Sequence, residues 1–316
     1  MRVFRSYWTL PKEALYAVAA IGNFDGVHRG HKALIEEVRA AAGRLGSPAA
    51  VITFEPHPRE VLQPEKAPKR LTPFRIKAGL LQDLGLDLLF ALPFTPTLRA
   101  KTPDAFVHDV LAGGLGVRHV VVGYDFRFGY RAAGDAATLD ALGREYGFGV
   151  TCLEAVAFER EVCSSTRIRD ALAAGEVGRA RELMGHPFVL EGRVVPGARR
   201  GRELGYPTAN LRLLGRNPLI PPAGVYAVRA GLRRAGGIEV RDAVASLGFR
   251  PTFDGEGFLI EVHLFDTRED LYGERLSCAF IERLRGEERF TSAVALVRQM
   301  DRDSQQARAV LAACPA

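Results

Sequence analysis

Short apolar runs alternate with helical patterns in the first half of the chain, and this alternation strongly restricts the folds available to it. Such near-continuous apolar runs are typical of parallel strands that are buried on both faces of a sheet. Strands that alternate with helices form βαβ units, so the pattern predicts a doubly wound parallel α/β domain. The predicted strands cover residues 15–21, 49–54, 87–92, 118–123 and 149–153.

The helices between these strands have readable ends. Thr72 and Thr102 each stand before a proline, which is the arrangement of an N-cap residue followed by Pro at the first helical position. Gly85 and Gly113 predict where these two helices end, because glycine often terminates a helix.

The pattern changes after a short helix that ends at Met184 and Gly185. Runs rich in β-forming residues follow without a long helix between them, which predicts an antiparallel barrel or a compact sheet. Residues 292–312 have apolar side chains at helical spacing and predict a C-terminal amphipathic helix. We therefore expect two domains, residues 1–184 and 185–316. The predicted strands of the second domain cover residues 188–195, 225–230, 240–247, 258–265 and 276–284.

The amino-acid composition indicates which kinds of ligand or partner this chain binds. The chain carries a net charge of +6 and has a pI near 9.3, but no basic run dominates. Dispersed charge favours small anionic substrates over nucleic acid, although a mild arginine excess without functional meaning is an equal alternative. The four cysteines form no close pair, and no apolar run resembles a signal peptide or a transmembrane segment. We expect a cytoplasmic protein without membrane or nucleic-acid partners, and a homo-oligomer remains open.

Residues 22–31, GNFDGVHRGH, lie where the first strand is followed by a helix. Helix N-termini carry unpaired N–H groups and partial positive charge, and glycines let the backbone approach a ligand, so phosphate is the natural guest. Imidazoles can donate hydrogen bonds to phosphate oxygens as charge shifts. The alternatives are two surface histidines or a zinc site, which needs further ligands nearby. The candidate nucleotide-binding residues are Gly22, Phe24, Asp25, Gly26, His28 and His31.

Three further segments follow other predicted strands and fall on the same carboxyl edge of the sheet, where open α/β domains bind ligands. Residues 54–58 and 123–129 offer aromatic faces, prolines and the carboxylate of Asp125, which suit a large flat ring better than a bare sugar. The alternative is that these aromatic residues only close the edge of the sheet. The candidate ring-binding residues are Phe54, Pro56, His57, Pro58, Asp125, Phe126 and Phe128.

The third segment, residues 163–169, opens a helix with hydroxyls and two arginines on its first turns. These groups suit a triphosphate or a departing pyrophosphate. Ordinary helix capping explains the segment equally well when it is taken alone. The candidate residues are Ser164, Ser165, Thr166 and Arg169.

Together these segments resemble the HxGH, FxPHP, GxxFxFG and SSTxIR motifs of bacterial FAD synthetases. The resemblance implies that the 5′-phosphate of FMN attacks the α-phosphorus of ATP, which yields FAD and pyrophosphate. It implies that His28 and His31 stabilise charge on the triphosphate. It also implies that Ser164, Thr166 and Arg169 hold the pyrophosphate, while Mg²⁺ neutralises the remaining charge. Two positions depart from the family pattern: Cys163 replaces an aliphatic residue, and Asp125 stands where some relatives have asparagine.

A second motif, GRELGYPTAN at residues 201–210, contains glycines and a proline that shape a loop. The loop exposes the Thr208 hydroxyl and the Asn210 amide oxygen, which are hard ligands suited to Mg²⁺ that also holds substrate phosphates. An ordinary Gly/Pro turn is the alternative. The candidate ATP and Mg²⁺ ligands are Gly201, Arg202, Gly205, Pro207, Thr208 and Asn210, with Thr208 and Asn210 on the metal.

This second motif resembles the GxPTAN sequence of riboflavin kinases. The resemblance implies that Glu261 is the general base, which takes the proton from the ribityl 5′-hydroxyl as that oxygen attacks the γ-phosphorus of ATP. It also implies a flavin site near Arg285 and Phe290, and we expect His263 to pack or hydrogen-bond beside Glu261. Agreement with the family continues through residues 222–226, 246–253, 261–266 and 271–273.

The two motif sets predict a bifunctional enzyme that uses ATP twice. Its C-terminal module phosphorylates riboflavin to FMN, and its N-terminal module adenylylates FMN to FAD. One alternative keeps a single active module, the kinase. Another alternative is a flavin- or nucleic-acid-binding regulator without turnover, which the dispersed charge and the few aromatic residues disfavour.

Overall fold

The computed structural model describes residues 1–197, 205–252, 255–267 and 269–314. The chain divides into two compact units, Met1–Ser164 and Ser165–Ala316. Each unit has its own sheet and its own core.

The first unit contains a six-stranded parallel sheet with the order β1-β4-β3-β2-β5-β6. Five of these strands, β2 to β6, confirm the five strands that we predicted from the apolar runs. The edge strand β1 was not predicted because it has only three residues and two of them are exposed. The strands are β1 (Arg2–Phe4), β2 (Val18–Ile21), β3 (Ala49–Phe54), β4 (Leu88–Leu92), β5 (His119–Gly123) and β6 (Gly149–Leu153).

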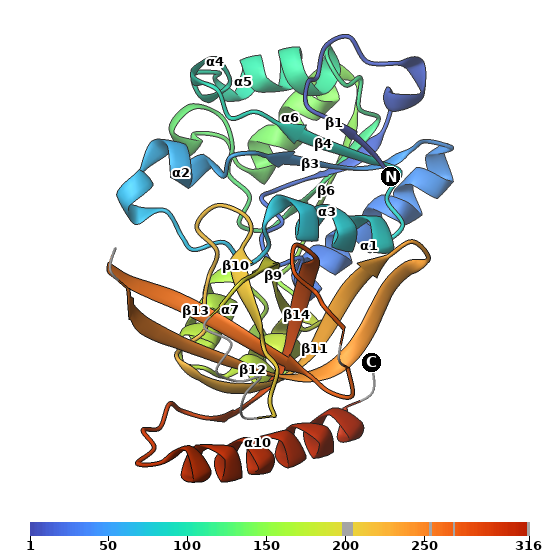
Figure 1. The fold of residues 1–316 in the computed structure, drawn as a ribbon. Coiled ribbons are helices and arrows are strands. Elements are labelled where there is room, and N and C mark those ends of the chain that lie inside the picture. The colour runs from blue at the N-terminus through green and yellow to red at the C-terminus, as the bar shows by residue number, and fades with distance from the viewer. Residues whose placement is uncertain (198–204, 253–254, 268, 315–316) are drawn as a thin grey trace. The chain divides into compact units, whose positions relative to one another are not determined.

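Helices cover both faces of this sheet (Figure 1). Val18 and Ala20 of β2 pack in one cluster and Ala19 and Ile21 in the other, because successive strand side chains point to opposite faces. Both faces are buried, so the strands read as continuous apolar runs. The helices of this unit are α1 (Arg29–Leu45), α2 (Pro58–Leu62), α3 (Phe74–Asp83), α4 (Pro96–Arg99), α5 (Pro103–Phe106) and α6 (Ala136–Tyr146). The shorter elements are η1 (Lys12–Ala14), η2 (Pro64–Lys66), η3 (Val107–Ala112), η4 (Tyr130–Ala132) and the hairpin of β7 (Ala157–Phe158) and β8 (Glu161–Val162).

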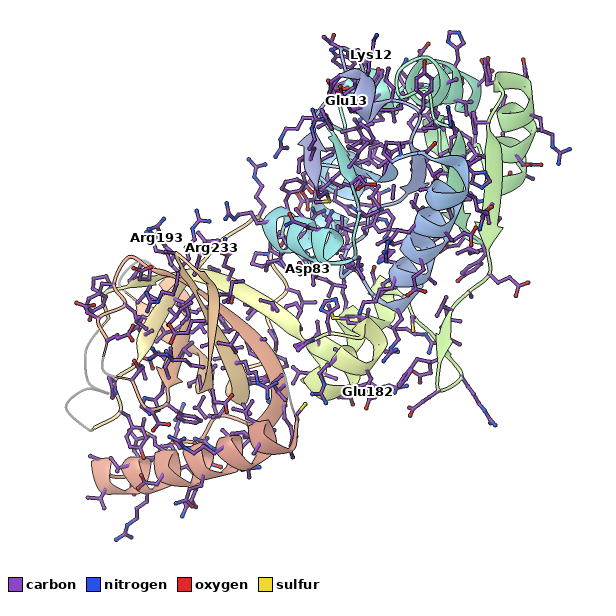
Figure 2. The ribbon with its side chains drawn as sticks, turned by 90° about the vertical axis from the view of Figure 1, so that its right-hand side faces the viewer. Lys12, Glu13, Asp83, Glu182, Arg193 and Arg233 are labelled. Carbon is purple, nitrogen blue, oxygen red and sulfur yellow. The ribbon has the colours of Figure 1, made fainter. Side chains whose placement is uncertain are left out.

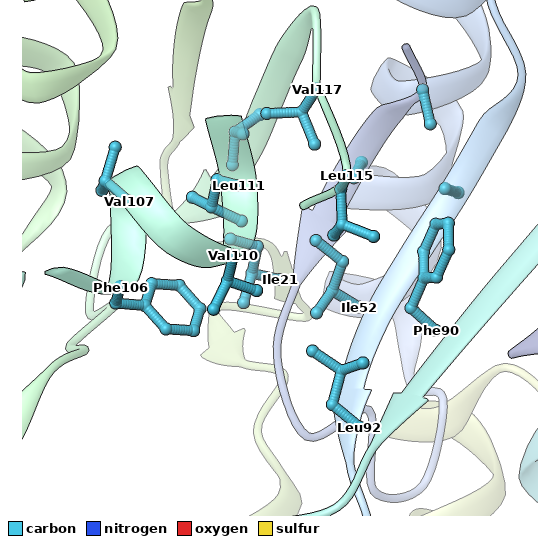
Figure 3. Close-up of a cluster of buried hydrophobic side chains, with 14 of the residues drawn as sticks. Ile21, Ile52, Phe90, Leu92, Phe106, Val107, Val110, Leu111, Leu115 and Val117 are labelled. Atoms are coloured by element: carbon cyan, nitrogen blue, oxygen red, sulfur yellow. The ribbon is translucent and has the colours of Figure 1, made fainter. Parts of the chain in front are cut away.

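One of the two clusters joins the sheet to η3 (Figure 3). Ile21, Ile52 and Phe90 come from three neighbouring strands, and Val107 and Val110 from η3 pack in the same cluster. The cluster on the opposite face is built with Ile35 and Val38 of α1 and Leu81 of α3. The sheet is therefore held between two apolar layers, and only its ends carry polar loops.

The two predicted helix starts have different outcomes. Thr102 caps α5 as expected, since its Oγ1 accepts a hydrogen bond from the Ala105 N–H at 3.1 Å. The prediction for Thr72 is wrong: α3 begins at Phe74 with Pro73 as its N-cap. The Thr72 hydroxyl instead accepts from the Gly26 N–H at 2.9 Å, so a tertiary contact has replaced the local cap.

The second unit is a closed six-stranded antiparallel barrel with the order β10-β13-β12-β11-β14-β9. The barrel alternative is thus confirmed over a compact open sheet. The strand β10 was not predicted, because its first two residues belong to the motif at residues 201–210 that we interpreted as a loop. The strands are β9 (Phe188–Val195), β10 (Ala209–Leu213), β11 (Gly224–Arg234), β12 (Gly237–Thr252), β13 (Gly255–Leu264) and β14 (Arg275–Arg285).

The helices described in this unit are α7 (Ser165–Ala173), α8 (Val177–Met184) and α10 (Ala293–Ala313). The predicted C-terminal helix is α10, which Ser292 caps and which packs on β11, β12 and β14. Helix α8 contacts β9 and β14, so the compact units divide before α7, whereas the predicted domain boundary lies after α8.

Charged side chains of both signs are distributed over the surface of each unit (Figure 2). Among the described residues, no helix combines the length and the apolar character needed to cross a bilayer. Exposed examples labelled in the figure are Lys12, Glu13, Asp83, Glu182, Arg193 and Arg233.

Candidate active sites

Residues 22–31 connect β2 to α1 at the point where the strand order of the sheet reverses. β3 and β4 continue the sheet on one side of β2, while β5 and β6 lie on the other. The connections that leave β2 and β5 therefore run to opposite faces of the sheet. In sheets of this class, ligands bind between two such connections, at the carboxyl edge. The histidine motif stands at the place where this class of sheet binds ligands.

His28 and His31 cap the start of α1 reciprocally. The His31 N–H donates to His28 Nδ1 at 3.4 Å, and the His28 N–H donates to His31 Nδ1 at 3.3 Å. The two rings stack with centroids 3.7 Å apart. Because each Nδ1 accepts a hydrogen bond, each neutral ring carries its proton on Nε2. The pair thus presents two N–H donors of fixed tautomer at a helix N-terminus.

The electrostatic surroundings keep His31 neutral. Burial lowers the pKa of His31 well below its ordinary value, and the electrostatic interactions of His31 with His28 and with Lys77 lower it further. A neutral imidazole can still donate a hydrogen bond to a phosphate oxygen through Nε2. The site is therefore equipped for hydrogen bonding to an anion at neutral pH without a fixed charge on His31.

The small and aromatic residues of the motif shape this loop. Gly26 has φ +91°, and a Cβ there would lie 2.9 Å from Leu71 Cδ1. A Cβ on Gly30 would lie 3.1 Å from His28 Cε1, so glycine leaves room for the stacked rings. Phe24 is fully buried, and its ring centroid lies 4.9 Å from that of His31. A Cβ on Gly22 would lie 3.2 Å from the Phe24 ring, so glycine at this position leaves room for Phe24.

Asp25 is engaged by the protein itself. Its carboxylate accepts hydrogen bonds from the N–H groups of Leu71 and Thr72 at 3.1 and 3.0 Å, and the Thr72 hydroxyl donates to it at 3.3 Å. Only 2% of Asp25 is exposed. These contacts favour a role in fixing the loop, and the predicted contact of Asp25 with ATP stays a prediction.

Two functional candidates in this region were missed in the sequence: Arg70 and Lys77. Both are buried, and both face the carboxylate of Glu55. A signal existed for Lys77, because it occupies the same helical stripe as Phe74 and Leu81, where an apolar residue is expected. A lysine on a buried helix face indicates a specific partner.

The loop after β3 is organised by its histidine and prolines. The Arg59 N–H donates to His57 Nδ1 at 3.1 Å, so His57 caps α2, and Pro58 is the first residue of that helix. Pro56 follows a cis peptide bond from Glu55. The contacts of Pro56, His57 and Pro58 with flavin stay predictions.

The aromatic residues of the two loops at the sheet edge belong to one cluster. Phe126 and Phe128 stack with centroids 5.4 Å apart, and Phe54 and Phe94 lie 5.9 Å apart edge to face. Phe128 is buried in the core, while Phe54 and Phe126 are only partly buried against it. Phe128 therefore fits the alternative that these aromatic residues only close the edge of the sheet. Phe54, Phe126 and the exposed Asp125 retain accessible surface for a ligand.

The hydroxyl segment lies at the division between the two units. Ser164 ends the first unit, and Ser165 is the first residue of α7 in the second. Thr166 and Arg169 follow within the first two turns, and Ile168 anchors the helix in the apolar interior. The predicted approach of these residues to the histidine pair stays a prediction.

In the barrel, Asn210 and Glu261 are direct cross-strand neighbours on β10 and β13. Glu261 also pairs with Ser246 of β12. The strand neighbours of Glu261, Ile260 and Val262, are buried, so Glu261 and Asn210 share the opposite face. The structure thus places Glu261 and Asn210 at directly opposed positions of two paired strands, and their roles as base and metal ligand stay predictions.

The loop before β10 is tied to the same strand. The His263 Nδ1 lies 2.9 Å from the Pro207 carbonyl oxygen, which indicates that this nitrogen donates and holds the residue before Thr208. Gly205 has φ +84°. Gly197 is a further candidate that was missed, since a Cβ there would lie 2.2 Å from Asn210 Nδ2. Gly201 and Arg202 lie outside the described residues.

Arg285 connects the barrel to the C-terminal helix. Its Nε and Nη2 donate to the two carboxylate oxygens of Asp303 at 2.9 and 2.7 Å, and Asp303 is only 3% exposed. The Arg285 guanidinium also lies 5.8 Å from the Phe290 ring centroid. These contacts position both predicted flavin neighbours, and their contact with flavin stays a prediction.

The donor set fits a metal that is shared with substrate. Among the described residues, no three His, Cys, Asp or Glu side chains gather as a metal site. Thr208 and Asn210 offer only two hard oxygens, which suits Mg²⁺ because that ion keeps several waters and takes further ligands from phosphates.

Both halves of the chain match known families. The FAD synthetase family matches residues 10–167, and the riboflavin kinase family matches residues 184–311. A bifunctional riboflavin kinase/FMN adenylyltransferase from Pseudomonas fluorescens is 41% identical over 99% of this chain and 98% of its own length. The protein of the same name from Escherichia coli K12 is also 41% identical, over 92% of this chain and 91% of its own.

A solved structure is similar to this chain over nearly its whole length. The crystal structure of a macrolide-efflux protein from Streptococcus pneumoniae superimposes with a TM-score of 0.86 at 32% identity, over 97% of this chain and 98% of that one. Two family matches in sequence order and relatives of nearly equal length lead to one assignment. The chain belongs to the bifunctional riboflavin kinase/FMN adenylyltransferase family.

Proposed function

We propose that this chain phosphorylates riboflavin with ATP to give FMN, and then adenylylates FMN with a second ATP to give FAD and pyrophosphate. The observation that carries the proposal is the presence of two different sites in one chain. A stacked histidine pair stands at the switch point of a parallel sheet, and a Glu–Asn strand pair stands on a barrel.

In the adenylyl transfer, a phosphate oxygen of FMN attacks the α-phosphorus of ATP and pyrophosphate leaves. No protein nucleophile is needed, so catalysis comes from positioning and from stabilising charge. The Nε2–H groups of His28 and His31 donate to the triphosphate as negative charge develops. The hydroxyls of Ser164, Ser165 and Thr166 and the guanidinium of Arg169 hold the leaving pyrophosphate.

In the kinase reaction, the 5′-hydroxyl of riboflavin attacks the γ-phosphorus of ATP and ADP leaves. Glu261 accepts the hydroxyl proton, which requires that its carboxylate lies within hydrogen-bonding distance of that hydroxyl. Thr208 and Asn210 would hold Mg²⁺, which neutralises phosphate charge when it is bound. Gly205 and Pro207 shape the loop that presents Thr208.

Product analysis tests the proposal directly. We expect purified protein with riboflavin, ATP and Mg²⁺ to form FMN and FAD. Glu261→Gln should stop FMN formation from riboflavin but leave FAD formation from added FMN intact, and His28→Ala with His31→Ala should do the reverse. Production of FMN alone by the unaltered protein would instead support a single active kinase module. Flavin binding without any ATP consumption would support a regulator.

The remaining expectations about partners are part of the same proposal. Small-molecule substrates require no nucleic-acid or membrane surface, and the dispersed charge is in keeping with this. The cytoplasmic location stays a prediction, and a homo-oligomeric state stays open.

A further inference from the structure

Two buried cations lie beside the predicted adenylyl-transfer loops, and neither belongs to the motifs. The side chains of Arg70 and Lys77 are 3% and 0% exposed. Arg70 Nη2 donates to both carboxylate oxygens of Glu55 at 2.6 and 2.8 Å, and Arg70 Nη1 lies 3.6 Å from Glu60 Oε1. Lys77 Nζ lies 3.6 Å from Glu55 Oε2. Because a buried charge without a partner is costly, these contacts fix the positions of both cations.

Lys77 contacts both substrate loops at once. Its Nζ donates to the backbone carbonyl of Asn23 at 2.9 Å, and Asn23 lies in the nucleotide loop of residues 22–31. The same Nζ pairs with Glu55, which lies in the flavin loop of residues 54–58. One ammonium group therefore joins loops that leave two neighbouring strands, β2 and β3.

The segment that carries these cations holds the nucleotide loop a second time. The N–H groups of Leu71 and Thr72 donate to Asp25, and the Gly26 N–H donates to Thr72 Oγ1. These groups are buried. The nucleotide loop cannot shift against residues 70–77 without breaking buried hydrogen bonds, which is costly.

We propose that Lys77 is a positioning residue for adenylyl transfer, and that it couples ATP and FMN binding by holding the Asn23 carbonyl and the Glu55 carboxylate together. The inference rests on the proposed function of this unit and deepens it. Lys77 acts through Asn23 and Glu55 and does not itself touch substrate. Because one ammonium group holds both loops, an adjustment of either loop on substrate binding is transmitted to the other loop and changes its affinity for the second substrate.

The test compares variants at each end of this connection. Lys77→Met keeps the length of the side chain without its charge, and Glu55→Gln keeps the shape of the partner. Lys66→Met is the matched control, because Lys66 is exposed. Initial rates of FAD formation over a grid of ATP and FMN concentrations give the factor by which each substrate changes the KM of the other.

We expect a coupling factor of about five or more in the unaltered protein, in the usual range for linked sites. The coupling factor should fall to about one in Lys77→Met and in Glu55→Gln. The double variant should lose no more coupling than the single variant with the larger loss, because both substitutions remove the same contact. Lys66→Met should keep the full factor. Phosphorylation of riboflavin by the same preparations should stay within about twofold in every variant, since the kinase residues lie in the other unit.

Each outcome decides the proposal. An unchanged coupling factor in Lys77→Met overturns it, as does a loss of kcat with the factor retained, which a merely structural role would produce. If Lys77→Met does not fold, Glu55→Gln decides alone, because Arg70 and Lys77 then still have a hydrogen-bonding partner. Absence of FAD from the unaltered protein would refute the proposed function, whereas FAD formation without any coupling would refute only this inference.

Discussion

The two candidate sites are held in place by different kinds of contact. In the α/β unit, the loops of residues 22–31 and 54–58 are positioned by buried backbone and side-chain groups of residues 70–77. In the barrel, Asn210 and Glu261 are positioned by the register of β10 against β13. A site built on loops thus depends on a few long-range polar contacts, whereas a site built on strands takes its geometry from many backbone hydrogen bonds.

The largest expected difference between the units comes from removing Arg70. Arg70→Met leaves the carboxylates of Glu55 and Glu60 without their main partner, so the first unit should lose about 3 kcal/mol of stability. Hydrogen exchange measured by mass spectrometry reports the two units separately. Exchange should accelerate in peptides of residues 1–164 and stay unchanged in the barrel.

Arg59→Met is the control for that change, because Arg59 is exposed on the neighbouring helix α2. A surface substitution of this kind should alter stability by less than about 0.5 kcal/mol. Equal acceleration in both variants would mean that the buried ion pairs do not stabilise this unit.

A smaller effect is expected for the ion pair of the barrel. Asp303→Asn weakens the contact of α10 with Arg285 and the hydrogen bond from Gln299 within the helix. We expect a loss of about 2 kcal/mol, because one charge of a largely buried pair is removed. Exchange should accelerate in α10, and the strand pair that carries Glu261 should keep its protection. Arg298→Met on the exposed side of α10 is the matched control. Loss of protection throughout the barrel would show that α10 and the strand ladder form one cooperative unit.

The pH dependence of stability should differ between the units. The pKa of His31 is lowered in the folded state, mainly by burial, so at pH values below the ordinary histidine pKa of 6.5 the unfolded chain binds more protons than the folded one. The stability contributed by neutral His31 is therefore present above that pH and is lost as the pH falls below it. The first unit should unfold at lower temperature at pH 5.5 than at pH 7.5.

His31→Gln should reduce this pH dependence, whereas His108→Gln should not, because 64% of the His108 side chain is exposed. Thermal unfolding followed by loss of FAD formation and of FMN formation would monitor the two units for the unaltered chain. Hydrogen exchange would measure how steeply the stability of the first unit changes with pH in His31→Gln. If this pH dependence equals that of the unaltered chain, it does not come from His31.

The smallest expected effects are those of helix caps, which should be alike in the two units. The side chains of Thr102 and Ser292 each accept one hydrogen bond from the backbone N–H three residues on. Replacing either by alanine should cost about 1 kcal/mol. Urea unfolding followed by hydrogen exchange would measure both. A much larger cost at either position would mean that the cap also supports tertiary packing.

Much of the fold could be predicted because its signals are local. β2 to β6 are continuous apolar runs, and the cap at Thr102 depends only on residues within one helical turn. β1 and β10 were missed because a short edge strand and a strand inside a glycine-rich motif carry no such run. Thr72 was misassigned because its hydroxyl bonds to Gly26, which lies 46 positions away in the sequence.

The candidate sites divide in the same way. The histidine pair was predicted together with its helix terminus, because both are encoded in ten consecutive residues. Arg70 was missed because an arginine near the surface and an arginine beneath a loop look identical in a sequence. Lys77 could have been noticed on the apolar stripe of its helix, but not its partner Asn23, which is 54 positions away.

The amino-acid sequence by itself determined the class of each unit and the position of each motif on it, because apolar periodicity and capping act between near neighbours. The tertiary structure decided which strands close the barrel, that Asn210 stands opposite Glu261, and that Lys77 joins two loops. The physical reason is that strand register and the pairing of buried charges minimise energy over the whole folded unit. These pairings join residues that are far apart in the chain, so they cannot be inferred from neighbouring residues alone.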